Sequence, residues 1–250
     1  MIDAQLAAVE NRFVIKTNPV SGAVTLIWWI EGPHHLSLDG SIIVGEIAYH
    51  LRSALDNLIC ALVRIDLPES SCAGRSFPIF VDADEFDAKA AESLKGVPGE
   101  ARTIIRSLQP FARGAGVRSD PLHILNVLSN RDKHRAMRLA AGYSARALFL
   151  ISHHTGKPLL SFRMPNAHFT AGPHIIELPL TVETVTPYAN VKAMGKNQVA
   201  FLDPGPWGDR PVDEVLTACV DYVDERVLPQ FRQFFSSTAA IQEDLNFSPD

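Results

Sequence analysis

The spacing of apolar residues changes near residue 136, and this change constrains the fold more than any other feature of the sequence. From Ser41 to Ile65, apolar residues recur every three or four positions without a proline. That spacing is typical of an α-helix with a buried face. After residue 136, short runs rich in β-branched and aromatic residues are separated by Gly, Pro and Asn, a pattern typical of strands and turns. The chain therefore combines a helical part with a strand-rich part.

The same reasoning predicts the other elements. Further helices are expected over residues 4–13, 84–94, 98–108, 120–135 and 212–235, the last with a kink at Pro229. Strands are expected over residues 23–30, 145–154, 159–164, 174–180 and 198–203, with an extended segment at 77–80. In the first strand, the neighbours Trp28 and Trp29 should divide into one core and one surface residue.

The order of these elements predicts the fold class. Strands follow one another in runs and do not alternate with helices, which favours an antiparallel sheet. We expect an α+β fold in which a helical N-terminal half packs on an antiparallel β-sheet and a long C-terminal helix closes the structure. One domain over residues 1–250 is the simpler organisation, and a boundary near residue 138 between a helical half and a sheet half is the alternative.

Composition excludes few classes of protein. Hydrophobic residues make up 46% of the 250 residues, and the net charge of -5 gives no global reason to expect a nucleic-acid or anionic-membrane partner. No apolar run is long enough for a transmembrane helix, and the first residues lack a signal-peptide pattern. Cys60, Cys72 and Cys219 are widely spaced and odd in number, which favours small apolar side chains in a reducing cytoplasm over a disulfide framework. We therefore expect a cytoplasmic protein without a membrane partner.

The helix over residues 41–65 carries polar residues on the side away from its leucines. Arg52 and Asp56 are four residues apart, which places their side chains side by side. Apolar residues accompany the pair on this side, so the helix is expected to be buried on two sides. A buried Arg and Asp must then be paired and hydrogen-bonded. An ordinary ion pair on the helix surface is the alternative.

The helix expected over residues 120–135 has a second polar line. His123, Asn126, Asn130 and His134 fall on one face, with Lys133 beside them. Two amides and two imidazoles are suited to contact a ligand. A solvated face whose last, basic residues complement the helix dipole is the alternative.

Four segments of these regions carry a family resemblance. They are GEIAYHLRSALDN (45–57), FPIF (77–80), LQP (108–110) and NRDKHR (130–135). Together they resemble a family of uncharacterised bacterial proteins that share an LRSALDHL-type helix, an FPI segment and an N-x-DKHR segment. The resemblance covers about residues 40–140. It implies a site on the two helices and no particular reaction.

These observations predict one polar cluster shared by the two helices. It would either hold the helices in register or bind a small polar or anionic ligand. The candidate ligand-binding residues are Tyr49, His50, Arg52, Asp56, Asn126, Asn130, Asp132, Lys133 and His134. The sequence has no Walker A loop, no GxGxxG after a strand and no GxSxG elbow, so it indicates no cofactor and leaves open whether the protein is an enzyme.

A weaker resemblance is to HEPN ribonucleases, whose mark is an Arg followed four to six residues later by a His on a helix. Arg52 matches the Arg, but Asn57 stands five residues on, where a His would be expected. The resemblance implies metal-independent cleavage of RNA by a homodimer. Arg52 would stabilise charge on the phosphate, and His50 or His134 would transfer the proton.

A metal site is the third alternative. Four side chains would converge on an ion if the two helices pack together: His50, Asp56, Asp132 and His134. The sequence has no HExxH motif or other close ligand spacing, and Lys133 and Arg135 would repel a cation. We therefore expect no bound metal.

Overall fold

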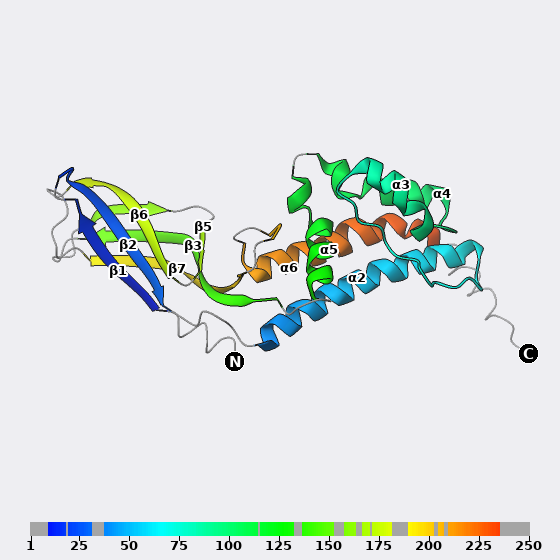
Figure 1. Ribbon diagram of the computed structural model, residues 1–250, viewed down its shortest axis with the longest axis horizontal. Helices are drawn as coiled ribbons and strands as arrows, with labels where there is room; N and C mark the ends of the chain where they lie inside the picture. Colours follow the sequence, from blue (N-terminus) through cyan, green and yellow to red (C-terminus); the bar gives the residue numbers. More distant parts are fainter. Residues whose placement is uncertain are drawn as a thin grey trace, which may run out of the picture. The chain divides into compact units, whose positions relative to one another are not determined.

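The computed structural model describes residues 10–18, 20–31, 38–114, 116–132, 137–152, 158–163, 167–170, 172–181, 190–202, 205–207 and 210–235. The chain divides into two compact units. The sheet unit comprises residues 1–42, 136–204 and 208–214, and the helical unit comprises residues 43–135, 205–207 and 215–250. Helices and antiparallel strands occupy different stretches of the chain, which confirms the predicted α+β class (Figure 1). Whether the two units act as one domain stays a prediction.

Five α-helices and four shorter helical turns are described. They are α2 (Leu38–Asp66), α3 (Ala83–Ser93), α4 (Gly99–Ser107), η1 (Pro110–Arg113), η2 (Val117–Ser119), α5 (Pro121–Asp132), α6 (Val212–Asp221), η3 (Tyr222–Val227) and η4 (Leu228–Phe231). The helices predicted over residues 41–65, 84–94 and 98–108 are confirmed. Within the described residues, every helix is too short or too polar to span a bilayer.

Side-chain hydrogen bonds explain where α3 and α5 begin. The Asp82 carboxylate accepts from the backbone N–H of Glu85 at 2.8 Å and caps α3. The Asp120 carboxylate accepts from the N–H of Leu122 at 2.8 Å, and α5 begins with Pro121. Helix α2 begins one turn before Ser41, whose hydroxyl donates a hydrogen bond to the carbonyl of Met137.

The C-terminal helical segment changes its winding before Pro229. Helix α6 ends at Asp221, a π-helical turn covers η3, and a 3₁₀ turn containing Pro229 follows. A proline has no N–H to donate, and its ring would clash with the carbonyl four residues before it, so the regular α-helical pattern cannot continue through it. The predicted α-helix over residues 212–235 is therefore regular only in its first half.

The sheet unit contains two antiparallel sheets. In the first, the strand order is β1 (Glu10–Thr17), β2 (Ala23–Glu31) and β6 (Gly172–Thr181). In the second, β3 (Leu139–Ser152) pairs with β4 (Pro158–Arg163), β5 (Ala167–Thr170) and β7 (Asn190–Phe201). Trp28 is fully buried while Trp29 is 40% exposed, which confirms that the pair divides between core and surface.

The helix predicted over residues 4–13 is wrong for its last four residues. Residues 10–13 belong to strand β1, which pairs with β2 from Glu10 opposite Glu31 to Thr17 opposite Val24. The turn between the strands is fixed by the side chain of Asn18, which accepts from the N–H groups of Val20 and Ser21. This hairpin turn and the β-branched residues that precede it favour strand pairing. The rest of the predicted helix lies outside the described residues.

Candidate functional site

The Arg52–Asp56 pair on α2 holds the backbone of Phe77. Arg52 Nη2 lies 3.1 Å from Asp56 Oδ1 and donates a hydrogen bond to the carbonyl of Phe77 at 2.6 Å. The N–H of Phe77 donates to Asp56 Oδ1 at 2.8 Å. Phe77 is fully buried and lies in a segment without helix or strand, so its backbone groups need side-chain partners. The pair supplies one donor and one acceptor to the same residue.

Gln109 does the same for the next residues of this segment. Its Oε1 accepts from the N–H of Phe80 at 2.9 Å, and its Nε2 donates to the carbonyl of Pro78 at 2.9 Å. A second hydrogen bond from Nε2 reaches the carbonyl of Ile105 at 3.1 Å. The Gln109 residue is fully buried. We name residues 72–80 the strap. Side chains supply its backbone with the hydrogen bonds that a neighbouring strand would supply in a sheet.

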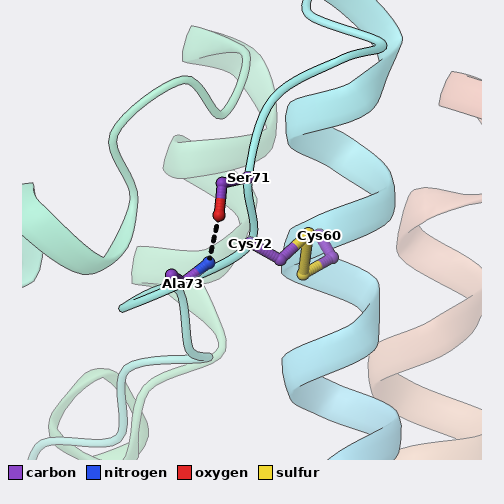
Figure 2. Close-up of a disulfide and its surroundings, with 4 residues drawn as sticks. All are labelled: Cys60, Ser71, Cys72 and Ala73. Atoms are coloured by element: carbon purple, nitrogen blue, oxygen red, sulfur yellow. Dashed lines mark hydrogen bonds between the residues drawn. A yellow bond between two sulfur atoms is a disulfide. The ribbon is translucent and has the colours of Figure 1, made fainter.

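A disulfide between Cys60 and Cys72 fixes the start of the strap to α2 (Figure 2). The Cα atoms of the two cysteines are 5.5 Å apart. Arg52, Asp56 and Cys60 are each four residues apart on α2 and form one stripe of the helix. The sequence prediction that the cysteines are unpaired is therefore wrong for Cys60 and Cys72. The chain reverses direction between them and returns along the same stripe.

The pair leaves part of its hydrogen-bonding capacity unused. Arg52 Nη1 is buried and has no hydrogen-bond partner among the described residues. The ion pair with Arg52 and the hydrogen bond from Phe77 both use Oδ1 of Asp56, and the Asp56 side chain is 34% exposed. Burial lowers the pKa of Arg52 from its ordinary value, although the charge of Asp56 opposes this shift. One donor of Arg52 and one carboxylate oxygen of Asp56 are thus without a hydrogen bond among the described residues.

The other predicted site residues do not join this pair in the described structure. Tyr49 is 57% exposed, and its ring contacts the exposed His50 edge to face with centroids 5.6 Å apart. On α5, Asn126 is half-buried and Asn130 is exposed, and no hydrogen bond joins either amide to these α2 residues. Asp132 is the last residue of α5. Its side chain, like Lys133 and His134, lies outside the described residues.

Two alternatives can be compared with this geometry. For the ribonuclease, Arg52 Nη2 is engaged by Asp56 and by the Phe77 carbonyl, and Asn57 lies on the exposed side of α2. For the metal site, the described part of the chain holds no group of three or more His, Cys, Asp or Glu side chains suited to a metal ion.

A second polar cluster was not predicted from the sequence. The Asp120 side chain is 2% exposed, and its Oδ2 lies 3.2 Å from Arg113 Nη1. The Arg113 guanidinium lies over the ring of Tyr222, 4.6 Å from its centroid, and the Tyr222 hydroxyl donates to the Leu108 carbonyl at 3.3 Å. In the sequence, Asp120 is only the first residue of a predicted helix. Tyr222 is too distant along the chain for any spacing rule to connect the two.

Burial dominates the protonation of this second cluster. It raises the pKa of the Asp120 carboxyl and of the Tyr222 hydroxyl, in both cases as the largest effect. Burial also lowers the pKa of His123, Asp120 opposes that shift, and Arg118 adds to it. The folded protein therefore favours the neutral imidazole.

We expect His123 to make the helical unit less stable as the pH falls. The unfolded chain binds a proton at the ordinary histidine pKa of 6.5, before the folded chain does, so stability is lost as the pH falls through this value. The free energy of unfolding, measured by urea denaturation at about pH 8 and about pH 6, should fall less in His123→Gln than in the parent protein. Equal losses in both proteins would contradict a neutral folded-state imidazole.

Comparisons with protein-family models, with curated proteins and with solved structures find no match to this chain. The resemblance to the uncharacterised bacterial family and the weaker one to HEPN ribonucleases stay predictions. An inference about function therefore depends on the geometry of the helical unit.

Proposed function

We propose that the helical unit binds a small polar ligand at the Arg52–Asp56 pair, beside the exposed ring of Tyr49. The observation that carries this proposal is that two groups of the pair, Arg52 Nη1 and Asp56 Oδ2, form no hydrogen bond with the described residues. A buried guanidinium N–H without an acceptor costs free energy, which the oxygen of a ligand or an enclosed water would recover. The second oxygen of Asp56 is available to accept a hydrogen bond in return.

The charge of the site favours an uncharged ligand over an anionic one. Arg52 and Asp56 neutralise each other, so an incoming anion would be attracted by the first and repelled by the second. A ligand group with an acceptor next to a donor, such as a carboxamide, matches the remaining Nη1 and Oδ2 atoms. Tyr49 precedes Arg52 by one turn and offers an aromatic surface to the rest of the molecule.

The proposal is for ligand binding without catalysis. Arg52 Nη2 is engaged by Asp56 and by the Phe77 carbonyl, and among the described residues no third titratable side chain is hydrogen-bonded to the pair. RNA as a substrate and a homodimer are expected only under the ribonuclease alternative. The cytoplasmic location stays a prediction.

Asp56→Asn tests the proposal without removing the contact to the strap. The amide oxygen of Asn still accepts from the N–H of Phe77, whereas the free acceptor becomes a donor. Binding of nucleosides and amino-acid amides is measured by ligand-observed NMR, with organic acids as the anionic arm. We expect a neutral ligand to bind and its Kd to rise about tenfold or more in Asp56→Asn.

Two further variants on the same helix serve as the control and as a test of the aromatic surface. Asn57→Asp changes the charge of an exposed neighbour on the same helix and should leave the Kd nearly unchanged. Tyr49→Ala removes the aromatic surface and should weaken binding while the strap stays in place. Binding of none of the probes, or binding that Asp56→Asn leaves unchanged, would contradict the proposal.

A further inference from the structure

The strap has two kinds of attachment to the rest of the helical unit. Arg52, Asp56 and Gln109 hold residues 77–80 through hydrogen bonds. Arg75 and Ser76 are also attached to α3, because Arg75 Nη1 donates to the Glu92 carbonyl at 3.3 Å and the Ser76 hydroxyl donates to that of Ser93 at 3.5 Å. Cys60 holds residue 72 through a covalent bond that thiol chemistry can open. Because the two kinds act on different residues, loss of the disulfide leaves the hydrogen-bonded half of the strap attached.

The disulfide lies within reach of a reductant. Cys60 and Cys72 are both half-buried, and Ala73 and Gly74 beside Cys72 are exposed. Figure 2 shows the disulfide between α2 and the loop that returns along it, with the Ser71 hydroxyl accepting from the N–H of Ala73 at 3.2 Å. Cys219 is buried, and its Sγ lies 3.5 Å from the Pro121 carbonyl, so it does not compete as an accessible thiol.

We propose that Cys60 and Cys72 form a reversible redox site that controls the order of residues 67–74 while the rest of the helical unit stays folded. The proposal does not depend on ligand binding at Arg52.

The reaction is a thiol–disulfide exchange with a dithiol reductant. A thiolate of the reductant attacks one sulfur of the Cys60–Cys72 bond, and the other cysteine leaves as a thiolate and takes up a proton. The second thiol of the reductant then attacks the mixed disulfide, which releases the remaining cysteine. Two electrons pass to the protein, which gains two S–H groups, and the reductant becomes a disulfide. An added low-molecular-weight disulfide reverses the reaction.

Reduction should change a short and exposed stretch of surface. Residues 66–69 are exposed, and residues 66–70 line a shallow hollow of about 380 Å³ next to the end of α2. This stretch lies inside the loop that the disulfide closes. When the bond opens, the loop regains the conformational freedom that the cross-link removed, and the hollow loses its fixed shape.

Thiol counting and hydrogen exchange on the full chain test this inference. After oxidation by glutathione disulfide and denaturation, alkylation should modify only Cys219, and after dithiothreitol it should modify all three cysteines. Reduction should raise amide exchange in residues 67–74 about tenfold or more, while the amides of α2 and of residues 77–80 change less than about twofold. Re-oxidation should restore the original exchange.

Two results would overturn the proposal. If all three cysteines are alkylated after oxidation, the bond does not form in solution. If reduction exposes the amides of α2 together with the loop, the disulfide is a structural cross-link of the whole unit. Cys219→Ser provides the control, because it removes the buried thiol and should reproduce the loop response of the parent protein. The reduction of the unaltered chain makes the test independent of whether a cysteine variant folds.

Discussion

Arg52→Ala should lower the free energy of unfolding by about 3 kcal/mol, because it removes one half of a largely buried ion pair. The Arg52 side chain is only 16% exposed. Its loss leaves the carbonyl of the buried Phe77 without a donor and the Asp56 carboxylate without its counter-charge. Urea denaturation followed by circular dichroism measures the change.

A second Arg–Asp pair in the helical unit provides the matched control. Arg106 donates two hydrogen bonds to Asp87, at 3.0 and 2.9 Å, but both side chains are about half exposed. Exposed pairs contribute little, so Arg106→Ala should cost much less than Arg52→Ala. Similar losses for the two variants would contradict the structural role that burial and the Phe77 contact assign to Arg52.

The same variant separates the structural role from the ribonuclease alternative. A ribonuclease would require the parent protein to cleave a mixed RNA pool in the presence of EDTA at some pH between about 5 and 8, where histidine titrates. Arg52→Ala would then abolish cleavage and leave the fold intact. If the substitution destabilises the protein and the parent leaves RNA uncleaved, the Arg52 side chain serves the fold.

The sequence predicts the local half of this site and misses the distant half. Spacing of four on a helix is enough to place Arg52 beside Asp56, and the expectation that a buried pair must be hydrogen-bonded is met by Phe77. Which residue would supply the contact could not be predicted. The strap has no periodic pattern, and Gln109 reaches it from beyond α3 and α4.

The cysteines show a similar limit. Counting and spacing treat Cys60 and Cys72 as unrelated, because one lies in a helix and the other in a loop. The chain turns back after α2 and brings residue 72 beside the stripe that carries residue 60. Such a reversal depends on where the returning chain packs, which local sequence does not encode. Strand β1 was missed for a different reason, because its β-branched residues and the turn at Asn18 were not recognised as one half of a hairpin with β2.

Gln109→Leu should lower the free energy of unfolding by about 3 kcal/mol, because leucine has a similar size and cannot form hydrogen bonds. The substitution leaves the N–H of Phe80 and the carbonyl of the buried Pro78 without their partner. Urea denaturation measures the loss, and hydrogen exchange at Phe80 should locate it in the strap. A loss below about 1 kcal/mol would mean that water replaces the amide without cost.

Combining Gln109→Leu with Arg52→Ala shows whether the strap behaves as one unit. Both side chains hold the same short segment, through Phe80 in one case and Phe77 in the other. Once one contact is lost and the segment separates, the second has less structure left to stabilise. The free energy of unfolding lost in the double variant should therefore be smaller than the sum of the two single losses, by about 1 kcal/mol or more. Additive losses would instead indicate that Phe77 and Phe80 are held independently of each other.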